Sequence, residues 1–292
     1  MPLFDLSDRV KLRLRGRDRV RFLNGQVTND VRKAGADHSL PACVLSAKGK
    51  IDAFILIGAE SDALLLDADP ALRTTLAPRL ERYVIADDVT IEDVTRELAL
   101  FHVTGELRPV LPNEMSWRSN KRYGTGGWDL FVEAAERDRT LGMLSALEPI
   151  CDAESAERWR IEQGIPRWAH ELTDQIIPLE ANLESEAIDY SKGCYIGQEV
   201  ISRMRMSGQT NKRLRGLLAV PDLPLVAGMR LASRSEEGQE AGWITSATRS
   251  DRLGKQIALG FVKRGFNEVG TRLIARCADE ATTVEVVELP FR

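Results

Sequence analysis

The chain has 292 residues, of which 43% are apolar and 29% are charged, an ordinary composition for a globular protein of about two domains. Its formal net charge of -4 gives no whole-molecule attraction to nucleic acid or to an anionic membrane. No apolar run approaches the roughly 20 residues of a membrane-spanning helix, and the N-terminus lacks the basic start and apolar stretch of a signal peptide. We therefore expect a cytoplasmic protein.

The first half of the chain reads as a mixture of strands and helices. Alternating apolar and basic residues at 10–16 predict a half-buried strand, and residues 51–67 read as a β-hairpin. Asp69 followed by Pro70 predicts the start of a helix, in which Pro78 should cause a kink or break. Strands are also expected near 89–94, 97–104 and 128–132, and a helix near 136–147. These residues therefore predict a mixed α+β unit.

The second half changes character twice. Asp152 predicts the start of a helix that Gly164 closes, and residues 165–195 are rich in loop signals. A further helix is expected at 196–207. From residue 212 onward, short β-rich runs follow one another between Gly, Pro and charged turns, which predicts a small antiparallel barrel or sandwich.

Cysteines and histidines are too scattered to form a permanent metal site. The four cysteines match neither a disulfide framework nor a Cys-x-x-Cys site, and the three histidines are isolated. Phosphate-binding loops, zinc-protease motifs and serine-hydrolase elbows are also missing from the sequence. The cysteines are Cys43, Cys151, Cys194 and Cys277.

Cys194 has the most informative local context. It lies between Gly193 and the helix expected to begin at residue 196, and Lys192 is two residues away. Helix N-terminal amides and a neighbouring cation stabilise a thiolate, so this context predicts a reactive or ligand-donating thiol. The alternative is a buried and inert small residue, which is how most free cysteines behave.

Two carboxylates occupy positions that call for a partner. Asp52 lies early in an apolar strand, where a carboxylate needs a charged partner, a ligand donor or solvent. Glu162 lies near the C-terminal end of a helix, where the dipole disfavours negative charge. Glu162 therefore accepts hydrogen bonds from a ligand or, as the more common case, pairs with Arg158 or Arg160.

Two groups of basic residues have the composition of a polyanion-binding surface. The alternative is a solvated face, which is the usual role of such runs. No stacking aromatic residues are interleaved with either group, which weakens a nucleic-acid interpretation. The groups are Lys11, Arg13 and Arg15, and Arg203, Arg205, Lys212, Arg213 and Arg215.

The octapeptide from Lys192 to Glu199 reads Lys-Gly-Cys-Tyr-Ile-Gly-Gln-Glu. It resembles the signature of the YgfZ branch of the aminomethyltransferase (glycine-cleavage T-protein) superfamily. Other stretches resemble the same superfamily in the same order along the chain, so the resemblance covers almost all of it. They are residues 16–30, 48–52, 160–166, 178–183, 242–246 and 258–260.

The resemblance implies a ring-like, three-domain T-protein arrangement of the α+β class around a central folate channel. Two ferredoxin-like α+β domains and a C-terminal antiparallel β-barrel are expected. The first domain would be discontinuous, formed by residues 1–50 and 150–211. Residues 51–149 would form the second domain and residues 212–292 the barrel.

The resemblance also implies tetrahydrofolate, or a folate derivative, as the cofactor. Glu162 aligns with the family glutamate that holds the pterin ring. Asp52 falls in the segment where true aminomethyltransferases keep an essential aspartate. Asn29 and Lys192 are assigned to the same folate site by this resemblance.

Two functions are implied. The first is a folate-dependent accessory protein for synthesis or repair of iron–sulphur enzymes, including tRNA-modifying ones, with Cys194 as its working thiol. The alternative is an aminomethyltransferase that moves a one-carbon unit from a lipoyl-bound aminomethyl group to tetrahydrofolate, with Asp52 as the essential acid. T-proteins usually carry an acidic residue at the place of Cys194 and are typically longer, so a non-enzymatic factor is favoured. Direct tRNA binding rests only on the basic groups.

Overall fold

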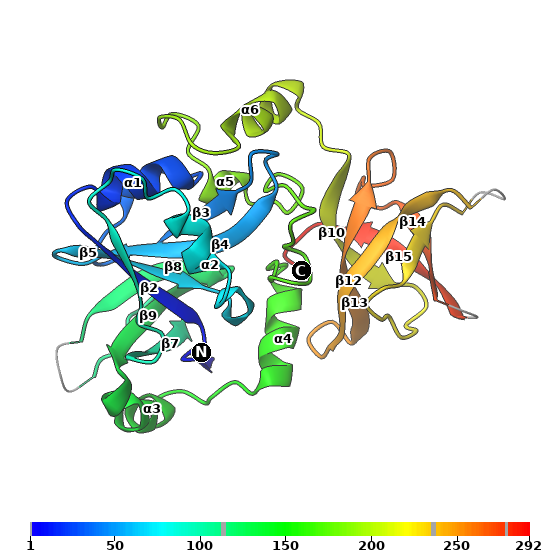
Figure 1. Cartoon of the computed structure of the whole chain (residues 1–292). Coiled ribbons are helices and arrows are strands. Elements are labelled where there is room, and N and C mark those ends of the chain that lie inside the picture. Colours follow the sequence, from blue (N-terminus) through cyan, green and yellow to red (C-terminus); the bar gives the residue numbers. More distant parts are fainter. Residues whose placement is uncertain (1, 112–114, 235–237, 278–279) are drawn as a thin grey trace.

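The computed structural model describes residues 2–111, 115–234, 238–277 and 280–292. Its strands form two open sheets and one closed barrel. Figure 1 shows the two sheets on one side of the molecule, the barrel on the other, and helix α4 (Ala153–Glu162) standing between them. The mixed α+β class expected from the sequence is confirmed.

The first sheet has five antiparallel strands in the order β3-β4-β5-β2-β6. The predicted hairpin at 51–67 and the predicted strand near 89–94 are both confirmed within it. The alternation that predicted β2 buries Val10, Leu12 and Leu14 in the core of this sheet. The strands are β2 (Val10–Arg15), β3 (Leu40–Leu45), β4 (Ile51–Ala59), β5 (Ala63–Ala68) and β6 (Thr90–Asp93).

The second sheet has four antiparallel strands in the order β1-β7-β9-β8. The strands predicted near 97–104 and 128–132 are β7 and β9, whereas the polar strand β8 gave no apolar alternation to detect it by. The strands are β1 (Leu3–Asp5), β7 (Leu98–Thr104), β8 (Trp117–Tyr123) and β9 (Thr125–Glu133).

The strands of the two sheets are not divided at residue 50, where the first part of the first domain was expected to end. β3 and β4 form a hairpin across that point, with Val44 paired to Ala53. Strand β1, at the start of the chain, pairs instead with β7 of the second sheet. Pairing between strands close in sequence closes only a short loop, so the hairpin keeps residues 51–68 with the first sheet. The expected boundary at 212 coincides with the first strand of the barrel.

The helices are short and lie around the sheets. Asp152 caps α4 as predicted, because its carboxylate accepts a 2.7 Å hydrogen bond from the Ser155 amide. The expected helix break lies before Pro78, between a 3₁₀ turn and α2. Pro78 itself lies in the first turn of α2, where its missing N–H costs no hydrogen bond. The 3₁₀ turns are Val31–Lys33, Pro70–Leu72 and Ala134–Glu136. The remaining helices are α1 (Arg19–Gln26), α2 (Leu76–Glu81), α3 (Arg137–Ser145), α5 (Glu184–Ala187) and α6 (Gln198–Ser207).

The C-terminal strands close into an antiparallel barrel, in the order β10-β13-β12-β11-β14-β15, which confirms the expected barrel. Closure follows from β10, which pairs with both β13 and β15. The strands are β10 (Lys212–Ala219), β11 (Arg230–Ala232), β12 (Glu240–Ser250), β13 (Lys255–Lys263), β14 (Arg272–Cys277) and β15 (Glu280–Val287).

One apolar cluster joins the parts. It contains buried side chains from the first sheet, from the central segment (residues 150–211) and from the barrel, among them Leu45, Ile161, Tyr195, Leu259 and Phe261. The central segment is therefore held from both sides. Among the described residues, no helix has the length and apolar character needed to cross a membrane.

Candidate functional site

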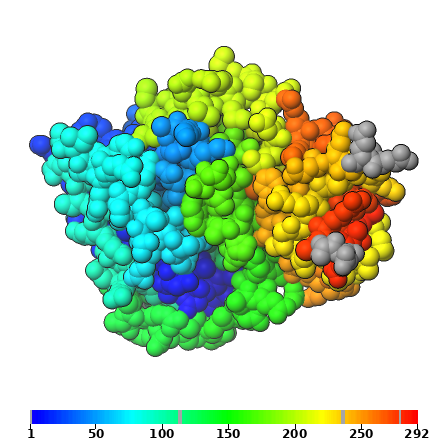
Figure 2. Space-filling view, turned by 45° about the vertical axis from the view of Figure 1, so that its right-hand side comes forward, coloured from blue at the N-terminus to red at the C-terminus, as the bar shows by residue number. Residues whose placement is uncertain are grey.

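A cavity of about 380 Å³ lies where the two sheets meet the central segment. Phe54 of β4, Tyr123 at the end of β8 and Trp168 of the central segment contribute to its lining. Figure 2 shows the N-terminal residues (dark blue) recessed between the segments coloured cyan and green. Leu6 and Arg9 of the N-terminal part also line the cavity. The volume is within the range of small-molecule sites.

Aromatic side chains form much of the apolar wall of this cavity. Tyr123 is held by stacking on Phe4, with ring centroids 4.0 Å apart and planes at 17°. Trp168 packs against the cores of both the first sheet and the central segment. The wall therefore presents flat, fixed surfaces of the kind that suit a planar heterocycle.

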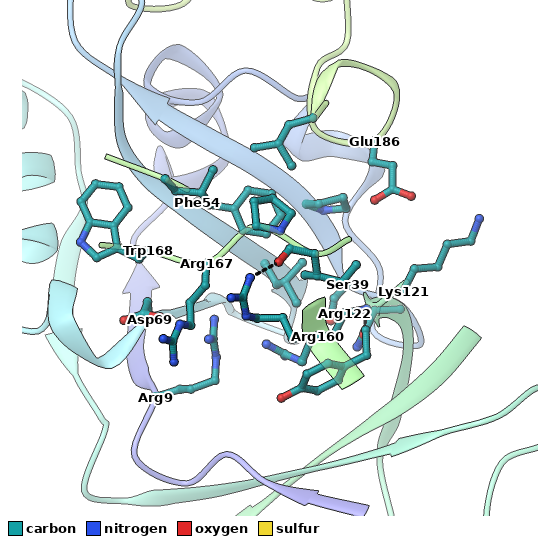
Figure 3. Close-up of a pocket in the computed structure, with 18 of the residues that line it drawn as sticks. Arg9, Ser39, Phe54, Asp69, Lys121, Arg122, Arg160, Arg167, Trp168 and Glu186 are labelled. Atoms are coloured by element: carbon teal, nitrogen blue, oxygen red, sulfur yellow. Dashed lines mark hydrogen bonds between the residues drawn. The ribbon is translucent and has the colours of Figure 1, made fainter. Parts of the chain in front are cut away.

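Basic side chains outnumber acidic ones in the lining of this cavity. The basic residues are Arg9, Lys121, Arg122, Arg160 and Arg167, and the acidic residues are Asp69 and Glu186. Figure 3 shows Arg9, Arg160 and Arg167 on the side of Asp69, and Lys121 and Glu186 at the other end. Each of the four arginines lies within 4.0 Å of a carboxylate, so Lys121 supplies the charge that would attract an anionic group on a ligand.

A buried ion network holds Arg122 in place. Its guanidinium lies 2.6 Å from Asp67 and 2.5 Å from Asp129, and Asp129 lies 2.7 Å from the imidazole of His102. Burial opposes the charge of Arg122, but the two carboxylates outweigh it and raise its pKa. Burial lowers the pKa of His102 despite Asp129, so the imidazole is held neutral. The network fixes Arg122 as a permanent cation of the wall.

Arg160 lies in the last turn of α4, and Arg167 lies in the loop that follows it. Arg160 lies 2.6 Å from Glu157 and 3.0 Å from the fully buried Glu171, which also accepts a hydrogen bond from Ser246 of β12. Its guanidinium is thus a fixed link between the cavity and the barrel. Lys121, by contrast, is exposed and has no carboxylate partner among the described residues.

Lys192 does not point to a ligand cavity. Its ammonium donates to the backbone carbonyls of Asn24, at 2.5 Å, and Val27, at 2.6 Å, and lies 4.9 Å from the ring centroid of Tyr195. Burial lowers its pKa to about 8. The side chain therefore anchors the octapeptide on the C-terminal end of α1.

The rest of the octapeptide is fixed against the turn between β3 and β4. The Ile196 amide donates to the Gly25 carbonyl at 3.2 Å. Gly197 has φ +85°, and a Cβ there would lie 2.7 Å from the Ser46 carbonyl oxygen, so only glycine fits without movement. A Cβ at Gly49 would likewise lie 2.9 Å from the Val200 side chain. Two stretches that the sequence linked only by resemblance are therefore in contact.

Cys194 is an exposed free thiol on this support. Its exposure rules out the buried, inert alternative, which instead describes Cys43, whose pKa burial raises to about 12. The helix expected from residue 196 begins at Gln198, so Cys194 lies ahead of the first turn of α6. The Lys192 ammonium is also bound elsewhere. The structure thus supports an accessible thiol, but not the activation by helix and lysine that the sequence predicted.

Asp52 has a charged partner. Arg79 donates from Nε to its carboxylate at 2.7 Å, and also donates to the Leu45 carbonyl at 2.7 Å. Asp52 is half-buried and does not line the cavity. Of the three environments that the sequence allowed for this carboxylate, the structure shows the ion pair.

Glu162 faces the barrel. Ser250 donates a hydrogen bond to its carboxylate, and the Phe291 amide donates to its backbone carbonyl at 2.9 Å. The expected alternative of an ion pair with Arg158 or Arg160 is wrong, because those arginines pair with other carboxylates. Glu162 does not line the 380 Å³ cavity.

Asn29 bonds to two residues of the cavity wall and does not line the cavity itself. Its amide nitrogen donates to the carbonyls of Pro41, at 2.9 Å, and Glu186, at 3.0 Å, and its oxygen accepts from the Asp30 amide. Pro41 and Glu186 both line the cavity. Asn29 is therefore a positioning residue whose own hydrogen bonds are internal.

Sequence reasoning missed the residues that line the cavity. Tyr123 and Arg122 lie on a polar strand, and backbone hydrogen bonds of Ser119 to Asp37 and Ser39 bring that strand to the first sheet. Trp168 lies two residues after the stretch 160–166 that resembles the superfamily, and this proximity was the one signal for it in the sequence. No cluster of three or more metal-ligating side chains occurs in the described ranges.

The comparisons with known proteins agree with this architecture. Residues 212–292 match the family of the glycine cleavage T-protein C-terminal barrel domain. The whole chain is 28% identical to the tRNA-modifying protein YgfZ of Shigella dysenteriae, covering 93% of that protein. It is 26% identical to the aminomethyltransferase of Shouchella clausii, over 99% of this chain and 86% of that protein.

A solved structure shows the same fold. The glycine cleavage system aminomethyltransferase T from Bartonella henselae superposes with a TM-score of 0.86 at 16% identity, over 100% of this chain and 86% of that one. The expected T-protein arrangement is thereby confirmed. Over its whole length the chain is therefore similar to proteins of the aminomethyltransferase (glycine-cleavage T-protein) superfamily, and its barrel matches their C-terminal domain. The similar proteins include YgfZ proteins, which align with 100% of this chain.

Proposed function

We propose that this protein is a folate-dependent accessory factor for synthesis or repair of iron–sulphur enzymes, including tRNA-modifying ones. Those enzymes, or the machinery that assembles them, would be its partners. The family supports the folate part of the proposal, and the names of the YgfZ relatives support the link to tRNA modification. The observation that carries it is the cavity in which aromatic and cationic side chains face one space.

Folate has the shape and charge for this cavity. Its pterin and aminobenzoyl rings are planar, and Phe54, Tyr123 and Trp168 offer planar surfaces. Its glutamate tail carries carboxylates, which the unpaired Lys121 would attract, whereas Arg122 already has two carboxylate partners. In this assignment Asn29 and Lys192 support the site without touching the ligand, and Glu162, which is bonded to Ser250, does not line it.

Cys194 would be the working thiol. Its neighbours Lys192 and Tyr195 are buried, while Cys194 is exposed, so the fixed loop presents the sulphur to a partner protein. A thiol that binds or exchanges with a partner must be accessible, and this one is. It would act as a transient cluster ligand or as a redox thiol.

The alternative is aminomethyl transfer to tetrahydrofolate. It is favoured by the full-length likeness to the Shouchella clausii aminomethyltransferase. Against it stands the ion pair between Asp52 and Arg79, which occupies the carboxylate that such chemistry would use.

Folate binding is tested by titrating tetrahydrofolate into the purified protein. Trp168→Ala should weaken binding about tenfold or more, because it removes a flat wall of the cavity. Lys121→Ala should weaken binding of a polyglutamylated folate more than that of the monoglutamate. Lys48→Ala, which removes an exposed lysine outside the cavity, is the matched control. Normal affinity in Trp168→Ala would argue against this cavity.

The role of Cys194 is tested by complementation. In a strain lacking the protein, Cys194→Ser should fail to restore the activity of iron–sulphur enzymes while retaining folate binding and a normal melting temperature. Cys277→Ser, which changes another exposed free thiol, should restore it. Full rescue by Cys194→Ser, together with aminomethyl transfer that Asp52→Asn abolishes, would favour the alternative.

A further inference from the structure

A second cavity, of about 540 Å³, lies between α6 and the start of the barrel. Figure 1 shows α6 above strand β10 at this junction. The end of α6, the central segment around Tyr190 and the barrel residues Arg213 and Arg215 line it. It shares no lining residue with the 380 Å³ cavity. It is therefore a separate site, and the folate proposal does not account for it.

The lining of this cavity is strongly basic. Four arginines line it, and Glu184 is the one carboxylate among the lining residues. Arg213 donates to Glu184, which neutralises that pair. Three guanidinium charges therefore remain around one cavity, in a chain whose net charge is -4. The four arginines are Arg205, Arg213, Arg215 and Arg264.

The three remaining arginines have only neutral partners. Arg215 donates to the Asn267 carbonyl at 3.0 Å, Arg264 donates to the Gln209 side chain, and Arg205 lies over the Tyr190 ring, 3.9 Å from its centroid. Within the described residues, no carboxylate lies within 4.0 Å of any of the three.

Arg203 provides the contrast. It lies two residues before Arg205 on the same helix, does not line the cavity, and pairs with Glu199 at 2.5 Å. Arginines on the other surfaces of this chain commonly have such a partner, for example Arg13 with Glu60 and Arg249 with Asp222. The missing counter-charge is thus a feature of this cavity.

Guanidinium charges gathered without carboxylates repel one another. Burial lowers the pKa of Arg215, the charge of Arg213 lowers it further, and the more distant Glu288 offsets this only in part. Arg213 and Arg215 are half-buried on the strand, and Arg205 and Arg264 are exposed at the rim. A bound anion would supply the missing counter-charge and would be partly shielded from water.

We propose that this cavity binds the phosphate group of an organic phosphate ester. Guanidinium groups present paired N–H donors that match phosphate oxygens, which favours phosphate over a single carboxylate when several arginines converge. The volume is that of a site for a whole small molecule, so space remains for the group that carries the phosphate. The stacked pair of Arg205 and Tyr190 offers a flat surface to a ring on that group.

Calorimetric titration of the full chain with adenosine monophosphate tests the proposal. Saturable binding is expected at low salt, weakening as salt is added, and adenosine without the phosphate should not bind. Arg215→Gln should weaken binding about tenfold or more, because it removes a charge-assisted contact. Arg264→Gln, at the exposed rim, should also weaken binding, and it replaces Arg215→Gln as the test variant if Arg215→Gln does not fold. Arg203→Gln is the matched control and should bind normally.

Further ligands distinguish the sources of the phosphate. A short single-stranded RNA that competes with adenosine monophosphate would identify a nucleic-acid phosphate, and an RNA that does not compete would identify a free nucleotide or similar small ester. The proposal is overturned if neither ligand binds saturably at low salt, if adenosine binds as tightly as its monophosphate, or if Arg203→Gln and Arg215→Gln weaken binding equally. Melting temperatures of the variants establish that each is folded.

Discussion

Lys192 and Cys194 are two residues apart but have opposite environments. The lysine is buried and bonded to two backbone carbonyls, whereas the cysteine is exposed. A neighbouring cation activates a thiol only when its charge is directed to the sulphur, and here the charge is directed to the end of α1. At the scale of the residue, the octapeptide combines one anchor with one accessible group.

Lys192 should give stability a measurable pH dependence. Its pKa is about 8 in the folded protein and 10.5 ordinarily, so the unfolded chain binds the extra proton between those values. The cost of burying its charge is fully present below pH 8 and is relieved as pH rises toward 10.5. The free energy of unfolding should therefore gain up to about 1.4 kcal/mol per pH unit across that window.

Urea denaturation at several pH values checks this expectation. Lys192→Met should lack the gain, and Lys48→Met, at an exposed position, should keep it. Equal slopes in Lys192→Met and in the unsubstituted protein would show that Lys192 does not titrate in this window.

At the scale of the element, the turn after β3 and the start of α6 fit together through glycines. Gly197 has a positive φ and no room for a Cβ beside Ser46, whereas a Cβ at Gly193 would meet nothing within 4 Å. The two glycines of one octapeptide therefore have different structural demands.

This difference predicts different effects of the same substitution. Gly197→Ala should lower the free energy of unfolding by about 1–3 kcal/mol, because the new methyl group meets a carbonyl and the backbone conformation is strained. Gly193→Ala should change it by roughly 0.5 kcal/mol or less. Chemical denaturation of both variants measures the contrast, and similar losses would contradict the described packing.

At the scale of the whole molecule, a single apolar cluster links the first sheet, the central segment and the barrel. Arg160 adds a polar link through Glu171 and Ser246. Because both cavities lie at junctions that this packing holds together, their geometry depends on all the parts at once.

The shared core predicts cooperative unfolding. Ile161→Ala, at a fully buried position of α4, should lower the free energy of unfolding by about 2–5 kcal/mol. The loss should appear in one transition that includes the barrel, monitored by tryptophan fluorescence and circular dichroism together. Separate transitions, with the barrel unaffected, would mean that the junction contributes little.

Local sequence patterns determined the elements and the fold class. Apolar alternation predicted β2 and the apolar runs at 51–67 predicted β4 and β5, whereas β3 was not predicted. Asp152 predicted the start of α4, and the octapeptide carried the resemblance to the superfamily. Strand β8 was not predicted because it is polar. Helix α6 begins later than expected because Gly197 adopts a left-handed conformation. Such signals depend on neighbours within a few residues, which the sequence displays directly.

Only the tertiary structure decided which side chains meet. Asp52 pairs with Arg79, 27 residues away, and Glu162 bonds to Ser250, 88 residues away, and neither lines the 380 Å³ cavity. The cavity instead gathers Phe54, Tyr123 and Trp168 from three separate segments. Hydrogen-bond partners and cavity walls arise from packing between distant segments, and no local pattern in the sequence encodes that packing.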